Sequence, residues 1–182
     1  SADLSQSQQL VFLHSGDHIT TEVRYVPRTN LLATPQLISQ RSTAHEYYAD
    51  HQGDDAQSGR LLIRSNLRQA NFDLYQLALD DSAGKPSTRL DPANWQNILA
   101  GDERTYLTNH LVFREHLFVE ARIDGLDQMM VVAQNGESHL IEMPEESYSL
   151  GFGTNADYGA KFLRLGYTSM VTPNTVYDYD LE

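Results

Sequence analysis

The sequence has no cysteine, few basic residues and no long apolar segment. Without cysteine there is no disulfide bond, no thiolate zinc site and no cysteine nucleophile. Every apolar run is interrupted by Arg, Asp, Gln or Asn, so none reaches the ~18 consecutive apolar residues that indicate a transmembrane helix. The 13 Lys and Arg residues are outnumbered by 25 Asp and Glu residues, which gives a formal net charge of −12. Because an acidic chain repels phosphate, we exclude nucleic acid and anionic membranes as main partners.

What the chain does contain is typical of a globular domain. It has 182 residues, of which 40% are apolar and 21% are charged, enough for one domain with a hydrophobic core. Residues 1–9 lack the apolar segment of a signal peptide, and the absence of a leader favours the cytoplasm. The chain starts without Met and stops directly after a strand-like run. We therefore expect a part of a longer polypeptide, with the true N-terminus missing from it.

Alternation of apolar and polar residues dominates the chain. It is clear from Thr20 to Val26, from Asn71 to Leu77 and from Thr175 to Asp180, and it is typical of half-buried strands. The segment Leu117 to Ile123 is a more buried version. No long segment has the three- and four-residue spacing of an amphipathic helix, and residues 92–99 allow at most one helical turn. The pattern predicts an all-β protein.

Four hairpins of one design recur along the chain. Their second strands begin near positions 20, 71, 127 and 174, a spacing of roughly 50 residues, and a shorter pair of strands fills each gap. Four strands per unit are typical of a β-propeller blade, whereas a β-sandwich would not repeat one hairpin at a fixed interval. We predict a partial β-propeller of about three and a half four-stranded blades: a half-blade at 9–27 and blades at about 35–79, 94–134 and 138–181.

The predicted blades do not close a ring, since closed propellers need at least about four blades. We therefore expect the terminal blades to expose apolar faces and to self-associate through them. Aromatic and aliphatic side chains should line the layers between blades: Tyr25, Phe72, Leu74, Phe118, Val131, Phe162, Leu165 and Val176.

Two motifs suggest ligand binding but lack the spacing or the helix that such a site requires. His45 and His51 are six residues apart, whereas a zinc-protease helix needs two histidines four apart. On a strand the two would share one face and could form a metal pair, but no third ligand is near. Gly151-Phe152-Gly153-Thr154-Asn155-Ala156 resembles a loosened dinucleotide fingerprint, but the residues that follow, Asp157 to Lys161, lead into another strand instead of the required helix. We interpret this segment as a loop between strands.

No catalytic apparatus is visible either. There is no Gly-x-Ser-x-Gly elbow, and Ser15, Ser65 and Ser169 lie at hairpin turns, where hydroxyls bond to nearby amides. We therefore assign no catalytic, metal-binding or cofactor-binding residue, expect no cofactor, and leave the substrate-binding residues open. Acidic pairs lie in polar loops, where solvent keeps them ordinary: Asp54-Asp55, Asp80-Asp81 and Glu145-Glu146.

Three parts of the chain resemble the oligopeptidase B (protease II) branch of the prolyl oligopeptidase family. The first part is His45-Glu46-Tyr47 followed by Leu62 to Asn66 and Asn71 to Tyr75; the second is Thr20 to Arg24. The third and most specific is Leu163 to Thr175, which looks like the last propeller blade before the hydrolase domain. Each motif is weak alone, whereas their order and spacing together are specific.

The resemblance implies a seven-bladed propeller that caps an α/β-hydrolase domain and admits only short peptides. That domain would supply a Ser-His-Asp triad and cleave after Lys or Arg, and no segment of this chain matches it. The chain would then be the later part of the propeller, its partners being the hydrolase domain of the same parent chain and short basic peptides. Its acidity fits steering of such peptides. The alternative is a non-enzymatic propeller that binds a protein or carbohydrate.

Overall fold

The chain is almost entirely β-structure. A computed structural model describes residues 1–79, 91–133 and 136–182, in which fifteen strands and one short 3-10 helix, η2 (Pro92–Asn94), are formed. This confirms the predicted all-β class, and η2 lies where one helical turn was expected. No helix in the described ranges has the length and apolar character needed to cross a membrane. The chain divides into two compact units, Ser1–Ala100 and Gly101–Glu182.

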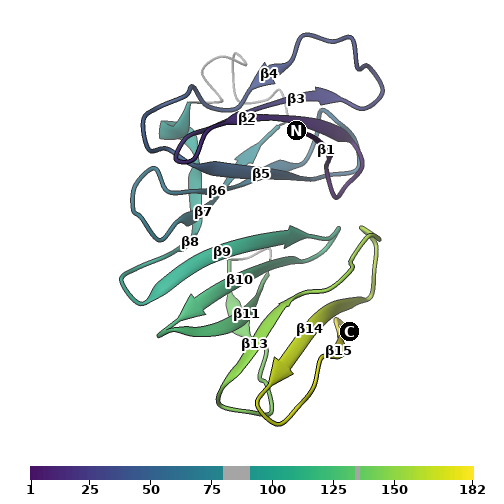
Figure 1. Cartoon of the computed structure of the whole chain (residues 1–182). Helices are drawn as coiled ribbons and strands as arrows, with labels where there is room; N and C mark the ends of the chain where they lie inside the picture. The colour runs from purple at the N-terminus through teal and green to yellow at the C-terminus, as the bar shows by residue number, and fades with distance from the viewer. Residues whose placement is uncertain (80–90, 134–135) are drawn as a thin grey trace. The chain divides into compact units, whose positions relative to one another are not determined.

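The first unit contains two four-stranded antiparallel sheets (Figure 1). In both, each strand pairs with its neighbours in sequence, so the sheets are simple meanders. The strands of the first sheet are β1 (Ala2–Leu4), β2 (Leu10–Gly16), β3 (Thr21–Pro27) and β4 (Gln36–Leu37). Those of the second are β5 (Tyr47–Gln52), β6 (Arg60–Ser65), β7 (Asp73–Ala78) and β8 (Gln96–Ala100).

The second unit also contains two antiparallel meanders, one of four strands and one of three. The tight turn at Asp124-Gly125, where both residues adopt a positive φ, joins two long paired strands of the four-stranded sheet. The four-stranded sheet has β9 (Thr105–Val112), β10 (Leu117–Ile123), β11 (Leu126–Val132) and β12 (Ser138–Leu140). The three-stranded sheet has β13 (Tyr148–Phe152), β14 (Phe162–Ser169) and β15 (Thr175–Asp180).

The sheets do not follow the predicted blade bounds. The predicted half-blade at 9–27 is a complete sheet, because β1 precedes it and β4 pairs with β3 through Arg24 and Leu37. The strand near residue 96 closes the second sheet, since β8 pairs with β7, and so the remaining sheets begin later than predicted. The predicted blades at 35–79, 94–134 and 138–181 correspond to sheets spanning 47–100, 105–140 and 148–180. Alternation locates a strand, but only the hydrogen-bond ladder assigns its sheet.

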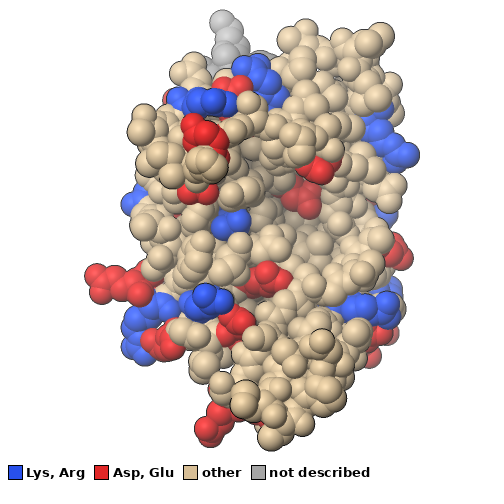
Figure 2. All heavy atoms as spheres, in the orientation of Figure 1, with Lys and Arg blue, Asp and Glu red and all other residues tan. Residues whose placement is uncertain are grey.

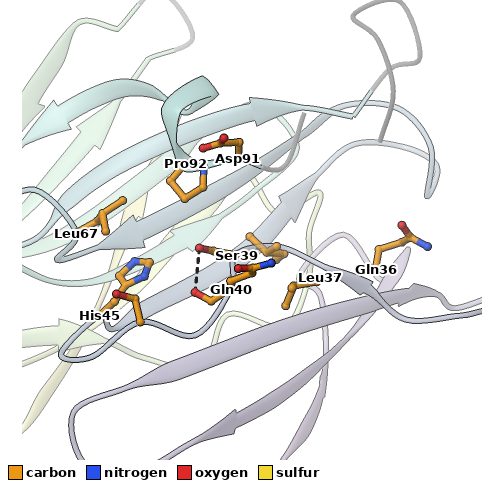
Figure 3. Close-up of a pocket in the computed structure, with 10 residues that line it drawn as sticks. Gln36, Leu37, Ser39, Gln40, His45, Leu67, Asp91 and Pro92 are labelled. Atoms are coloured by element: carbon orange, nitrogen blue, oxygen red, sulfur yellow. Dashed lines mark hydrogen bonds between the residues drawn. The ribbon is translucent and has the colours of Figure 1, made fainter. Parts of the chain in front are cut away.

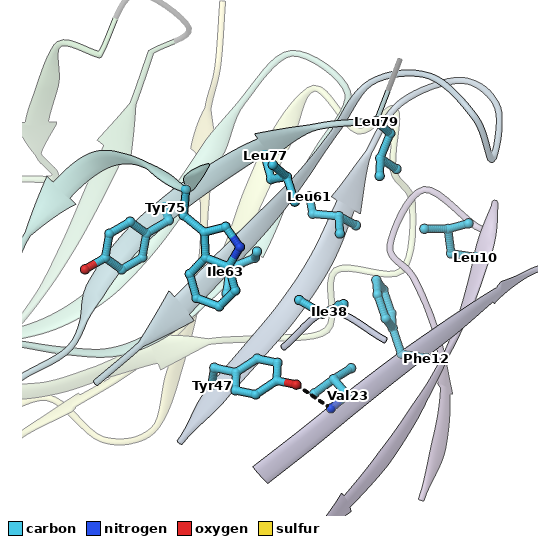
Figure 4. Packing of buried hydrophobic residues seen from close by; sticks show 11 residues of the cluster. Leu10, Phe12, Val23, Ile38, Tyr47, Leu61, Ile63, Tyr75, Leu77 and Leu79 are labelled. Atoms are coloured by element: carbon cyan, nitrogen blue, oxygen red, sulfur yellow. Dashed lines mark hydrogen bonds between the residues drawn. The ribbon is translucent and has the colours of Figure 1, made fainter. Parts of the chain in front are cut away.

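The core of the first unit lies between its two sheets (Figure 4). Leu10, Phe12 and Val23 from the first sheet meet alternate residues of β6 and β7, such as Ile63 and Tyr75. Each of these five side chains is at most 2% exposed. Burial of such side chains contributes about 1.5–3 kcal/mol each, so this layer holds the two sheets together.

Tyr47 adds a polar link to the same layer. Its hydroxyl accepts a hydrogen bond from the Val23 amide at 2.8 Å and donates one to the Ser39 carbonyl at 2.8 Å. The side chain is fully buried, and burial raises the pKa of its phenol. Figure 4 shows the bond between Tyr47 and Val23 crossing from one sheet to the other.

The second unit has a comparable layer. Phe118 and Val131 of the four-stranded sheet pack with Leu163 and Leu165 of β14. Phe118, Val131 and Leu165 therefore lie between sheets as expected. Phe162 and Val176, also expected there, are 43% and 65% exposed. In the β14–β15 register they fall on the face opposite Leu163 and Leu165, which explains the difference.

The other predicted layer residues also vary. Tyr25 is only partly buried against the core of the first unit, whereas Phe72 and Leu74 are buried. Phe72 has a φ of 61°, a backbone conformation that residues other than Gly, Asn or Asp rarely adopt.

Candidate functional site

The two histidines singled out from the sequence have separate environments. His45 Nε2 is 2.9 Å from Ser65 Oγ, and its ring stacks on Tyr47 at 4.9 Å. His51 is fully buried, with Nδ1 2.7 Å from Ser7 Oγ and Nε2 2.9 Å from the Ser58 carbonyl. A carbonyl only accepts, so Nε2 of His51 carries the proton and Nδ1 accepts from Ser7. The described residues contain no group of three side chains that could hold a metal ion.

Two Ser–His pairs therefore exist at the distance of a catalytic pair. Substrate cannot reach Ser65, which is fully buried, and Ser7 is only 5% exposed. The second nitrogen of His51 bonds to a carbonyl instead of a carboxylate. A nucleophilic serine needs access and an acid that orients its histidine, so both pairs are structural links. Burial lowers the pKa of both imidazoles, which keeps them neutral.

The three serines predicted to bond to nearby backbone amides at hairpin turns do so only in part. Ser65 Oγ accepts the Leu67 amide at 3.1 Å and Ser169 Oγ accepts the Thr172 amide at 2.9 Å, which confirms bonding to nearby backbone. Ser15 differs, because its hydroxyl accepts from the Arg41 guanidinium at 2.9 Å.

The glycine-rich segment begins inside a strand. Gly151 lies in β13 and pairs with Gly166 of β14, so the interpretation of the whole segment as a loop is wrong at its start. No helix follows in which backbone amides could bind a pyrophosphate.

The acidic pairs have local roles. Asp55 accepts the amides of Gln57 and Ser58 and the Ser58 hydroxyl, which lowers the pKa of its carboxyl. Glu145 accepts the Thr172 hydroxyl. Asp80 and Asp81 lie outside the described residues.

The first unit has a hollow beside β4, which we call the β4 pocket (Figure 3). Its volume is about 710 Å³. Figure 3 shows Asp91 and Pro92 on one wall, facing Ser39 and Gln40. Leu67 and His45 lie at one end of the pocket, and Gln36 lies at the other. Leu37, Ile38 and Ser42 also line the pocket. This is a mixed pocket with apolar walls and hydrogen-bonding side chains.

The charge of the β4 pocket is negative. Asp91 is the only carboxylate among the described residues that line it, and none of them is Lys or Arg. His45 adds no charge, because burial lowers the pKa of its imidazole. Elsewhere charges are mixed: Figure 2 shows acidic and basic side chains interspersed on one face of the molecule. The pocket is therefore chemically suited to a cation or to a group rich in hydrogen-bond donors.

Sequence reasoning missed both the pocket and a buried polar network. Asp50 Oδ1 accepts the Gln6 amide at 2.9 Å, while Ser5 and Ser7 hydroxyls lie 3.0 Å apart beside His51. Burial raises the pKa of the Asp50 carboxyl to about 6. The sequence does contain a signal for this network, because Asp50 and His51 are polar residues inside a strand pattern and Ser5 and Ser7 lie in a serine-rich turn. The pocket had no such signal, because its residues come from separate segments.

The family described as prolyl oligopeptidase, N-terminal β-propeller domain, matches residues 1–182. Protease 2 of Moraxella lacunata is 28% identical over 178 residues, which make up 98% of this chain and 24% of that protein. Dipeptidyl aminopeptidase BI of Pseudoxanthomonas mexicana is 27% identical over 178 residues, 96% of this chain and 22% of that protein. The chain thus spans about a quarter of the length of these curated relatives.

Solved structures give the same fold. Oligopeptidase B from Trypanosoma brucei with covalently bound antipain, in its closed form, matches with a TM-score of 0.84 at 19% identity. Oligopeptidase B from Leishmania major matches with a TM-score of 0.83 at 20% identity. Both matches cover 100% of this chain and 25% of the other chain. Together with the family match, they confirm the predicted partial β-propeller.

Proposed function

Since the chain belongs to the prolyl oligopeptidase N-terminal β-propeller family, we propose that it forms part of the substrate-gating propeller of a serine oligopeptidase. The observation that carries this proposal is the match of the family over all 182 residues. In the proposed enzyme a separate α/β-hydrolase domain supplies the Ser-His-Asp triad, and the propeller admits short, unfolded peptides from the cytoplasm.

The division of labour agrees with the chemistry of the described residues. Both Ser–His pairs are buried and neither has a carboxylate in the third position. The relatives and solved structures are about four times as long as the matched region, which leaves room for a catalytic domain. The propeller then acts by restricting access to a nucleophile that it does not contain.

We propose cleavage after Lys or Arg as the specificity. The similarity to Protease 2 and to two oligopeptidase B structures supports this choice. The net charge of −12 supports it physically, because an acidic surface raises the local concentration of cationic peptides and speeds their encounter.

The test uses the full-length protein that contains this chain. We expect it to hydrolyse fluorogenic peptide amides ending in Arg or Lys, and a serine-directed phosphonylating reagent should abolish the activity. The 182-residue chain alone should show no turnover. Preference for proline amides, or release of dipeptides from free N-termini, would refute the specificity. A full-length protein that hydrolyses none of these and has no nucleophile elbow would be a binding scaffold.

A further inference from the structure

We propose that the β4 pocket binds the side chain of a Lys or Arg residue, and that the peptide carrying it adds as a strand beside β4. The choice of a peptide as occupant rests on the proposed function; the choice of a cationic side chain rests on the pocket itself.

The polar groups of the β4 pocket favour a cationic side chain. Asp91 uses Oδ1 to accept the Ala93 amide at 2.9 Å, and within the described residues Oδ2 makes no hydrogen bond. Gln36 donates its amide group to the Thr34 carbonyl at 3.1 Å, which leaves its side-chain oxygen as an acceptor. A carboxylate and amide oxygens without a lysine or arginine select a cation with several donors, as in guanidinium or ammonium groups.

The apolar surface of the β4 pocket fits the methylene stem of such a side chain. Leu67 is 41% exposed at one end of the pocket, and Pro92 adjoins Asp91 on its wall. Lysine and arginine carry a charged head on a long methylene stem, and they bury the stem against apolar surface while the head stays hydrated. Leucine and proline next to one carboxylate provide both halves of that arrangement. A bare metal ion or a small ammonium ion would leave the apolar part unused.

The outer edge of β4 is also suited to a peptide. This strand is the outermost of its sheet, and within residues 1–79, 91–133 and 136–182 it pairs with β3 alone. The Ile38 amide donates to the Val23 carbonyl at 3.0 Å. Peptide groups alternate in direction along an antiparallel strand, so those of Leu37 face away from β3. A free edge of this kind accepts an extended peptide through main-chain hydrogen bonds, while a neighbouring pocket selects its side chain.

The experiment combines photo-crosslinking with matched variants of the full-length protein. The probe is a nonapeptide with a central arginine next to a benzoylphenylalanine, compared with the same peptide carrying neutral citrulline. Asp91→Asn removes the charge but keeps an oxygen for the Ala93 amide. Asp17→Asn is the control, because Asp17 accepts the Ile19 amide at 3.0 Å in the same two-residue geometry and does not line the pocket. Leu67→Lys, at an exposed site, adds an opposing positive charge.

We expect crosslinks from the arginine peptide to map to residues 36–45, Leu67 and Pro92. Citrulline, Asp91→Asn and Leu67→Lys should each weaken labelling by about 5-fold, the equivalent of one partly exposed ion pair, and Asp17→Asn should not. Equal labelling by the citrulline peptide, or by Asp91→Asn protein, would overturn the proposal, as would crosslinks confined to other segments.

Hydrolysis of arginine amides by the same preparation separates the two proposals. Hydrolysis without charge-dependent labelling refutes the pocket alone. Charge-dependent labelling of the pocket by a protein without peptidase activity supports the pocket and refutes the proposed function.

Discussion

Replacing Tyr47 by phenylalanine should be costly although it removes a single oxygen atom. The Tyr47 hydroxyl bonds to the Val23 amide and to the Ser39 carbonyl, both at 2.8 Å, inside a fully buried layer. Phenylalanine keeps the ring packing but leaves both backbone groups without this partner. A buried polar group left unpaired costs about 1–3 kcal/mol. We therefore expect Tyr47→Phe to lower the free energy of unfolding by about 3 kcal/mol, a large part of the 5–15 kcal/mol typical of a domain.

The assay is equilibrium denaturation in urea, followed by fluorescence of Trp95. This is the only tryptophan of the chain, and its ring centroid lies 6.1 Å from that of Tyr47. The matched control is Tyr48→Phe on the same strand, whose exposed hydroxyl donates to Glu46 at 3.4 Å. The control should change stability by less than about 0.5 kcal/mol. If Tyr47→Phe costs no more than Tyr48→Phe, the hydroxyl does not link the sheets energetically.

Three further predictions concern glycines, protons and salt. Gly59→Ala should lower the melting temperature far more than Gly125→Ala. Both glycines have a positive φ, which costs about 1–2 kcal/mol for alanine, but a Cβ at Gly59 would lie 2.1 Å from the Gln52 carbonyl oxygen, whereas one at Gly125 meets nothing within 4 Å. Similar melting temperatures for the two variants would contradict this prediction. Burial lowers the pKa of His51 and raises that of Asp50 to about 6. Asp50→Asn should therefore raise the free energy of unfolding by about 3 kcal/mol at pH 8, a gain that vanishes below pH 4, and a loss at pH 8 would show that the carboxylate is stabilising. In this variant, where Asp50 no longer titrates, the free energy of unfolding should fall below pH 6.5 through His51. Added salt should lower kcat/KM of the full-length protein on arginine substrates, since screening weakens attraction to an acidic surface, and an unchanged kcat/KM would exclude steering.

Alternation located strands in which one face is more buried than the other, as in β14. Strand β6 is instead buried on both faces, and there the run of apolar residues indicated the strand. Leu117 to Ile123 and Thr175 to Asp180 were predicted with the same bounds as β10 and β15. The strand β1 was missed, since its three residues are all exposed and too few to show a period. Sheet membership could not be read either: Gln36–Leu37 is compatible with either neighbour until its hydrogen bonds to β3 are known.

The candidate site was less predictable than the fold. The β4 pocket combines residues near 36–45 with Leu67 and Asp91, and nothing in their sequence spacing indicates that they meet. The histidine pair illustrates the opposite case. His45 and His51 are conspicuous in the sequence, yet each is held by serines from another segment. The family resemblance gave the functional hypothesis because it used the order of whole hairpins, which is kept even where individual contacts differ.

The meander order of the four sheets has a consequence for biosynthesis. In every described sheet, each strand bonds to the strand made just before or just after it. Most loops between partners are short, the longest connection being the one from Ala78 of β7 to Gln96 of β8, so the entropy lost on closing most of them is small and pairing can be rapid. A sheet can therefore be completed as soon as its own segment has left the ribosome, without waiting for distant parts of the chain. Translation should then deliver finished sheets one after another, so that within each unit the second sheet meets the apolar face of the first.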